Sequence, residues 1–133
     1  MKLIYFPYKG PAFLGVVKIG ISFKNVHIII FGPRGDNYVA DMLTMREEPS
    51  KIPPIKCTNL SYEELAYGAL PRLLKIIRYV LNKYPQDIIL IAPTVTSALL
   101  KEDIQMIKSN LKESEQERIF FPPVNFFKDE EYR

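Results

Sequence analysis

The order of apolar and polar residues along the chain predicts short buried strands that alternate with amphipathic helices. Apolar runs of strand length occupy residues 2–6 (KLIYF), 26–31 (VHIIIF), 87–92 (DIILIA) and 118–121 (RIFF). The second run is rich in β-branched residues with little polar alternation, which is typical of a strand covered on both faces in a parallel sheet. We therefore predict a mainly parallel sheet of about four strands.

Four stretches outside these runs carry apolar residues at helical spacing. They are residues 16–23, 39–45, 61–81 and 101–113. Gly20, with its low helix propensity, weakens the prediction of a helix for the first of them. The third begins with Ser61 and Glu64 at the spacing of a capping box, and Pro71 inside it predicts a kink or a restart. The prolines of EEPSKIPPIK (47–56) predict a loop.

The alternation of strands and helices predicts one three-layer, Rossmann-like α/β domain with right-handed crossovers. A length of 133 residues, 47% of them hydrophobic, is that of a single domain with an ordinary core. Three loops, residues 9–15, 32–37 and 92–97, would leave the carboxyl ends of the first three predicted strands. Because ligands of open α/β folds bind at that edge, we expect the candidate site where these loops converge.

Charge and hydropathy exclude two classes of partner. The 18 basic and 15 acidic residues leave a net charge of +3 without a basic block, which does not favour nucleic-acid binding. The apolar runs are far shorter than the about 20 residues of a membrane span. The opening MKLIYF lacks the pattern of a signal peptide, so we expect the protein to work in the compartment where it is made.

Cys57 and His27 are the only cysteine and the only histidine. An internal disulfide, a CxxC pair, a catalytic triad and a histidine metal site are therefore excluded for this chain alone. Cys57 is predicted to be a small buried apolar residue, and His27 a hydrogen-bonded strand histidine and not a ligand. Any metal centre would need ligands from elsewhere.

Asp36 is the candidate ligand indicated by its position after an apolar strand. It lies in FGPRGDNY (31–38), a glycine-bounded turn directly after the most apolar run. Asp36 either caps a helix beginning at Asn37 or serves as a ligand, and residue chemistry alone favours the cap.

The loop after the third predicted strand offers Thr94, Thr96 and Ser97 at a helix N-terminus. Such a position suits an anion or a polar ligand, although Thr96 and Ser97 are more commonly helix caps. The loops match neither GxGxxG nor the Walker pattern, so nucleotide binding is not supported.

Several longer stretches carry a family resemblance. They are MKLIYFPYKGPAFLG, SFKNVHIII, GPRGDNY, DIILIAPTVTSALLKEDIQ and PPVNFF, in this order from residue 1 to about residue 127. With them the chain resembles the B subunits of light-independent (dark-operative) protochlorophyllide reductases, in the nitrogenase component 1-like family.

The resemblance implies a subunit of a ferredoxin- and ATP-dependent oxidoreductase that reduces protochlorophyllide to chlorophyllide in chlorophyll biosynthesis. Two N and two B subunits would form a heterotetramer, which receives electrons from a separate L-type reductase protein. A 4Fe–4S cluster would be shared with the N-type subunit, which supplies three cysteine ligands, and Asp36 would supply the fourth. The expected location is the plastid stroma or the bacterial cytoplasm.

The chain departs from the family pattern in two ways. Val95 stands where the family carries a cysteine, and Phe13 where it carries a histidine. Family members are also several times longer, so residues 1–133 would correspond to a single N-terminal domain. The chain would then be either a fragment of a B subunit or a short B subunit whose missing domains another chain carries. The alternatives are a non-catalytic B-like interaction module in a larger complex and, with less support, a free-standing small-molecule binding domain.

Overall fold

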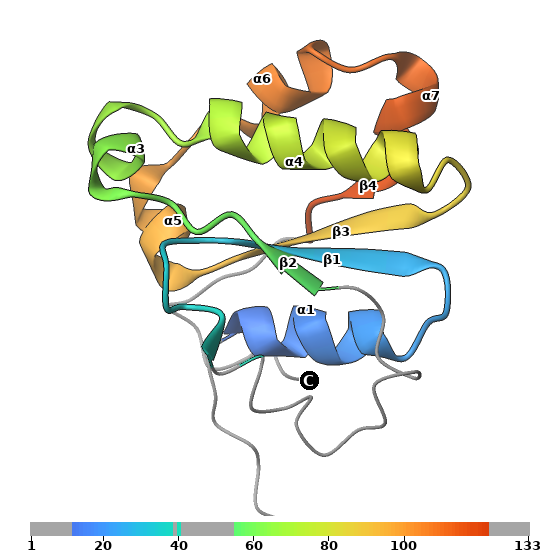
Figure 1. Cartoon of the computed structure of the whole chain (residues 1–133), viewed down its shortest axis with the longest axis horizontal. Helices are drawn as coiled ribbons and strands as arrows, with labels where there is room; N and C mark the ends of the chain where they lie inside the picture. Colours follow the sequence, from blue (N-terminus) through green and yellow to red (C-terminus); the bar gives the residue numbers. More distant parts are fainter. Residues whose placement is uncertain (1–11, 39, 41–54, 123–133) are drawn as a thin grey trace, which may run out of the picture.

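A four-stranded parallel sheet forms the centre of the residues that the computed structural model describes, which are 12–38, 40 and 55–122 (Figure 1). Its strands are β1 (Val26–Phe31), β2 (Ile55–Cys57), β3 (Ile88–Pro93) and β4 (Ile119–Phe120). They lie in the order β2-β1-β3-β4, and every neighbouring pair is parallel. The predicted α/β class with a parallel sheet is confirmed.

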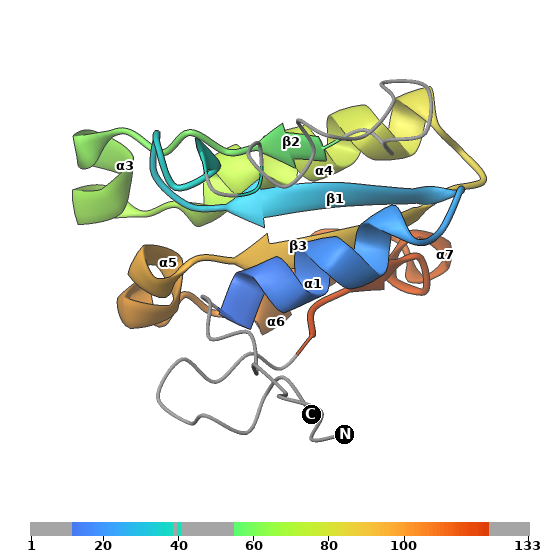
Figure 2. The same cartoon turned by 90° about the horizontal axis from the view of Figure 1, so that it is seen from below.

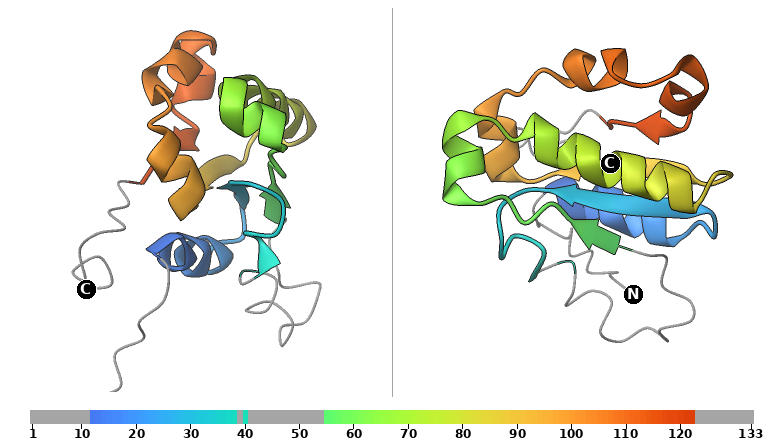
Figure 3. Two further views of the ribbon diagram at one scale, coloured as in Figure 1. Left: turned by 90° about the vertical axis from the view of Figure 1, so that its left-hand side faces the viewer. Right: turned by 45° about the horizontal axis from the view of Figure 1, so that its top comes forward.

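Helices cover both faces of this sheet, so the described residues form three layers (Figures 1 and 2). The helices are α1 (Ala12–Ile21), α3 (Tyr62–Tyr67), α4 (Leu70–Lys83), α5 (Val95–Leu100), α6 (Ile104–Ser109) and α7 (Glu113–Gln116). Helix α1 packs on one face, and α4 packs on the other (Figure 3). Among the described residues, no helix is long and apolar enough to cross a bilayer.

Strand β1 is buried along its whole length because it supplies both cores. Ile28 and Ile30 pack with α1, while Ile29 and Phe31 pack with α4. The lack of polar alternation in VHIIIF is explained by this double cover.

Helix α1 begins at Ala12, four residues before the predicted start, and ends at Ile21 instead of Phe23. The predicted loop 9–15 was therefore wrong over its described part. Gly20, which weakened the sequence prediction, has a packing role. A Cβ atom there would lie 2.6 Å from Ile28 Cδ1, so the glycine lets the helix approach the sheet closely.

The predicted helix 61–81 consists of two helices. Ser61 caps α3, and the predicted capping box with Glu64 is present. Gly68 then adopts a φ of +138°, and α4 begins at Leu70 with Pro71 in its first turn, so the proline marks a restart.

Two predicted elements lie outside the described residues, and one observed strand was missed. The predicted strand 2–6 and most of the predicted helix 39–45 belong to the part that is not described. Strand β2 begins at Ile55, inside the segment 47–56 that was predicted as a loop, so that prediction was wrong for residues 55 and 56. Its three residues carry no periodicity of their own, and pairing with β1 in the register Ile28↔Ile55 makes them a strand.

The predicted amphipathic helix 101–113 is shorter than expected. Lys101 adopts a left-handed φ of +49°, and the Asp103 side chain then accepts a hydrogen bond from the Gln105 amide as the cap of α6. Helix α6 ends at Ser109, and α7 follows separately. Local capping therefore divides a segment whose apolar spacing alone predicted one helix.

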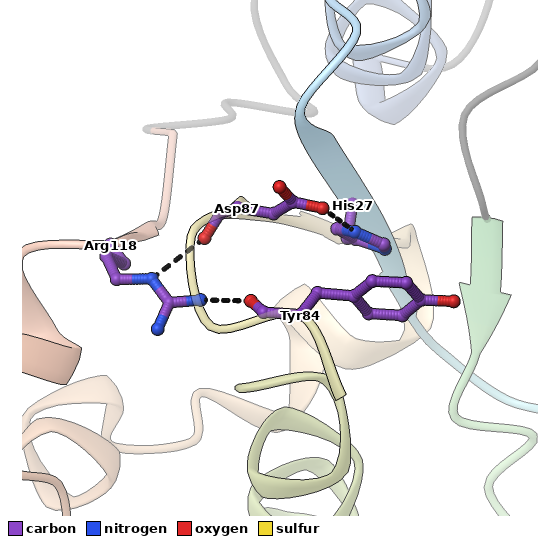
Figure 4. A network of polar contacts seen from close by, with 4 residues as sticks. All are labelled: His27, Tyr84, Asp87 and Arg118. Atoms are coloured by element: carbon purple, nitrogen blue, oxygen red, sulfur yellow. Dashed lines mark hydrogen bonds and ion pairs between the residues drawn. The ribbon is translucent and has the colours of Figure 1, made fainter. Parts of the chain in front are cut away.

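His27 lies at the start of β1 in a polar network at the amino end of the sheet (Figure 4). Its Nε2 atom is 2.6 Å from Asp87 Oδ2, and its ring centroid is 4.0 Å from that of Tyr84. Arg118 donates to the backbone carbonyls of Asp87 and Tyr84 at 2.9 and 2.6 Å. The prediction of a hydrogen-bonded strand histidine is confirmed for Nε2, whereas buried Nδ1 has no partner among the described residues.

Candidate functional site: the carboxyl edge of the sheet

Two of the loops expected to form the site leave the same edge of the sheet. Strands β1 and β3 are parallel neighbours in the register Phe31↔Pro93, and the Thr94 amide donates to the Phe31 carbonyl at 3.0 Å. The amino end of α1 lies at the same edge (Figures 1 and 2). The predicted convergence is therefore confirmed for the loops 32–37 and 92–97, whereas the described part of 9–15 belongs to helix α1.

Gly32, the first residue after β1, is held by a buried threonine from the segment that follows β2. Its amide donates to Thr58 Oγ1 at 3.0 Å, and the Thr58 hydroxyl donates to its carbonyl at 2.9 Å. The Leu60 amide donates to the same carbonyl at 3.1 Å. These bonds fix the base of the turn that carries Asp36.

On its other side, Gly32 meets Thr94. A Cβ atom at Gly32 would lie 2.5 Å from Thr94 Oγ1, closer than any side chain could tolerate. Thr94 is buried, and its hydroxyl has no hydrogen-bond partner among the described residues. Thr94 therefore positions the turn through close packing, and nothing larger than glycine fits between it and Thr58.

The turn itself places Asp36 beyond the edge of β1. Gly35 adopts a φ of +105°, which favours glycine. The Asp36 amide donates to the Pro33 carbonyl at 3.3 Å, and the Tyr38 amide donates to the Gly35 carbonyl at 3.0 Å. The Asp36 side chain is half-buried. As the cap of a helix that begins at Asn37, Asp36 would accept from the amides of residues 38 and 39, and residue 39 lies outside the described residues.

The third loop differs from the prediction in its capping. Helix α5 begins at Val95, so its N-cap is Thr94, and Thr94 makes no side-chain capping bond. Ser97 lies inside the helix, and its hydroxyl donates to the Thr94 carbonyl at 3.0 Å. The interpretation of Thr96 and Ser97 as caps was wrong because the helix starts before them.

Phe13 and Val95 occupy the two positions where the resemblance would place a histidine and a cysteine. Phe13 is buried in the core between α1 and the sheet. Val95 is 43% exposed at the first position of α5. Neither can ligate a metal or carry a proton.

The remaining candidate ligands do not join Asp36 in one cluster. His27 lies at the amino end of β1, the opposite end from the turn. Cys57 packs against the core beneath α1, as predicted for an apolar residue, but it is half-buried in the edge strand β2 and not fully buried. Among the described residues, no group of three histidine, cysteine, aspartate or glutamate side chains is placed to hold a metal ion. A metal centre at this edge would draw most of its ligands from outside the described part of the chain.

Thr58 is the site residue that sequence reasoning missed. It is fully buried and bonds to both the amide and the carbonyl of Gly32. Its role depends on β2 lying beside β1, and the sequence before it predicted only a loop. The signal that could have located it is the short apolar pattern of Ile55 and Cys57 after the prolines.

The family of the chain follows from a comparison with known protein families. Residues 11–133 match the family of nitrogenase component 1 type oxidoreductases, and the chain belongs to this family. A solved structure described as nitrogenase Cp1 at pH 6.5 has the same fold. It aligns with a TM-score of 0.58 and 18% identity over 81% of this chain and 22% of its own.

Within the family, the chain is similar to the B subunits of light-independent protochlorophyllide reductases. The one from Heliobacterium modesticaldum is 36% identical over 99% of this chain. Those from a Synechococcus strain and from Chlamydomonas moewusii are 36% and 32% identical over 96%. The chain spans about a quarter of the length of these relatives, at 25%, 25% and 23%.

Proposed function

We propose that this chain is the N-terminal domain of a B-type subunit of light-independent protochlorophyllide reductase, or a B-type chain that another chain completes. The observation that carries this proposal is the similarity, at 32–36% identity over nearly all residues, to B subunits from bacteria and a green alga. The assembled enzyme would take electrons from ferredoxin, use ATP, and reduce protochlorophyllide to chlorophyllide in chlorophyll biosynthesis.

The partners that this function requires are an N-type subunit, in a heterotetramer of two N and two B subunits, and an L-type reductase protein. The plastid stroma or the bacterial cytoplasm is the compartment we infer, since the relatives come from both kinds of organism. The carboxyl edge of the sheet, where Asp36 lies, would face the N-type subunit.

We assign Asp36 as the one ligand from this chain to a 4Fe–4S cluster whose three other ligands are cysteines of the N-type subunit. The assignment is supported by the half-buried carboxylate on a turn that Gly32 and Thr58 hold in place. When bound, the cluster would pass single electrons. An oxygen ligand in place of a thiolate would shift its potential.

The test is the iron content and the electron paramagnetic resonance spectrum of the chain purified together with its partner subunits. Asp36→Ala should change the spectrum and lower the iron content, because it removes the oxygen ligand. Asp36→Cys should retain iron and give a different spectrum, because thiolate is the softer donor. Glu117→Ala, which removes an exposed carboxylate far along the chain, is the matched control and should leave both measurements unchanged.

An unaltered spectrum and iron content in Asp36→Ala would favour the second candidate, a non-catalytic B-like interaction module. One observation supports this alternative. Phe13 and Val95 replace the histidine and cysteine expected from the resemblance. In that case Asp36 would serve only the local structure of its turn.

A further inference from the structure

A groove lies between β2 and α4, away from the turn that carries Asp36. Its volume is about 390 Å³, and its lining is Lys56, Cys57, Arg72, Lys75, Ile76 and Tyr79. Three of these residues are cations, and none of the described lining residues carries a carboxylate. We refer to it as the α4–β2 groove.

The periodicity of α4 explains why the cations gather on this side. The helix contains four basic residues and no acidic one. Arg72, Lys75, Tyr79 and Lys83 follow each other at spacings of three and four residues, so they form one stripe along the helix. The buried residues Leu73, Ile77, Val80 and Leu81 form the opposite side, against the sheet.

Two of the groove cations, Lys56 and Arg72, make aromatic and backbone contacts, and no carboxylate of the described residues pairs with the three cations. Lys56 Nζ lies 5.1 Å from the centre of the Tyr79 ring, and Lys83 Nζ lies 5.6 Å from it. Arg72 Nε donates to the Thr58 carbonyl at 3.2 Å. Within the described residues, the one ion pair is that of His27 with Asp87, at the amino end of the sheet.

Among the described residues, the cations of this surface are therefore not balanced by carboxylates. Beside the groove, a hydrogen bond to the Tyr79 hydroxyl, at 3.3 Å, raises the pKa of Lys83 above its ordinary value. A hollow lined by charges of one sign attracts opposite charges from solution.

We propose that the α4–β2 groove docks an acidic segment of a partner protein, with carboxylates opposite Lys56 and Lys75 and an apolar side chain on Ile76. A protein segment fits better than nucleic acid for two reasons. The cations flank an apolar and aromatic floor formed by Ile76 and Tyr79, and the net charge of the whole chain is only +3. The groove contains no residue of the Asp36 turn, so docking can be measured separately from cluster binding.

The test uses the full chain and a fluorescent peptide of sequence Glu-Glu-Leu-Glu-Glu-Leu-Glu-Glu. A second peptide with Gln in place of every Glu is the uncharged control. Fluorescence anisotropy should detect binding of the acidic peptide only, and the affinity should fall as NaCl rises from about 20 to about 300 mM. Amide chemical shifts should change for residues of β2 and α4 and not for the turn at residues 33–36.

Two variants with the same change in charge distinguish this groove from general attraction. Lys56→Glu/Lys75→Glu should weaken binding by at least about tenfold, because it reverses both proposed contacts. Lys24→Glu/Lys108→Glu reverses two lysines outside the groove and should change the affinity only slightly. Thermal unfolding followed by circular dichroism should be similar for both, because none of these four lysines belongs to the buried core.

Three results would overturn the proposal. The first is an equal loss of affinity in the two double variants, which would indicate attraction to net charge. The second is displacement of the peptide by duplex DNA at a lower concentration, which would assign the groove to nucleic acid. The third is self-association, measured by light scattering without peptide, that Lys56→Glu/Lys75→Glu abolishes, which would assign the groove to a second copy of this chain. None of these results bears on the iron content or spectrum of the Asp36 variants.

Discussion

Gly32 lies between two buried threonines at the carboxyl end of β1. Thr58 bonds to its amide and carbonyl on one side, and the Thr94 side chain fills the space on the other. The contact of Thr94 with Gly32 is steric, since a Cβ atom at Gly32 would lie 2.5 Å from Thr94 Oγ1. The position of the Asp36 turn therefore depends on the absence of a side chain at Gly32.

Gly32→Ala should lower the free energy of unfolding by about 1–3 kcal/mol, because its Cβ would lie 2.5 Å from Thr94 Oγ1. Urea unfolding measures this change. In the double variant Gly32→Ala/Thr94→Ala, loss of both the Oγ1 and Cγ2 atoms of Thr94 makes room for the new methyl group. The double variant should therefore be more stable than the sum of the two single effects predicts. Strictly additive effects would contradict the packing described here.

Helix α3 illustrates an element that depends on local bonds. Ser61 Oγ accepts from the Glu64 amide at 3.2 Å, and Glu64 Oε2 accepts from the Ser61 amide at 2.9 Å. None of its six residues is buried. By contrast, α4 owes its position to four buried apolar residues, so the two helices should respond differently to the loss of a cap.

Ser61→Ala should destabilise α3 locally without unfolding the domain. Loss of the cap costs about 1 kcal/mol, which should raise amide hydrogen exchange in α3 by about fivefold. The urea midpoint of the whole protein should change little, because α3 opens as a local unit. Ser114→Ala, at an exposed position in α7, should leave exchange in α3 unchanged. A large shift of the global midpoint in Ser61→Ala would refute local opening.

At the scale of the whole molecule, large apolar side chains are exposed over the helices near the carboxyl edge of the sheet. Tyr67 is 92% exposed and Met106 is 60% exposed, and both line a hollow of about 370 Å³ between the α3–α4 junction and α6. Leu99 on α5 is 62% exposed. Such surfaces are seldom left uncovered on monomeric proteins.

We therefore expect the isolated chain to associate with itself as its concentration rises. Light scattering should report an average mass that increases with concentration, and Tyr67→Ser/Met106→Gln should reduce this increase. Phe23→Ser removes a comparably exposed apolar residue after α1 and should not reduce the increase in mass. A monodisperse monomer at high concentration would count against the prediction.

Elements with a strong local signal were predicted well from the sequence. The apolar runs located β1, β3 and β4 to within one residue at each boundary, because a buried parallel strand needs a continuous apolar run. The capping box at Ser61 and the restart at Pro71 were also found, because capping and proline geometry act within a few residues. The start of α1 was predicted four residues late, because no capping side chain marks it in the sequence.

The sequence by itself determined the α/β class, the order of the main elements, and the position of Asp36 directly after the most apolar strand, since periodicity and turn residues act locally. Only the tertiary structure decided that residues 55–57 form a strand, that Thr58 and Thr94 enclose Gly32, and that Lys56 joins the cations of α4 in one groove. These features depend on contacts between residues far apart in the chain. Their energy comes from the packed sheet, and no local pattern of residues encodes it.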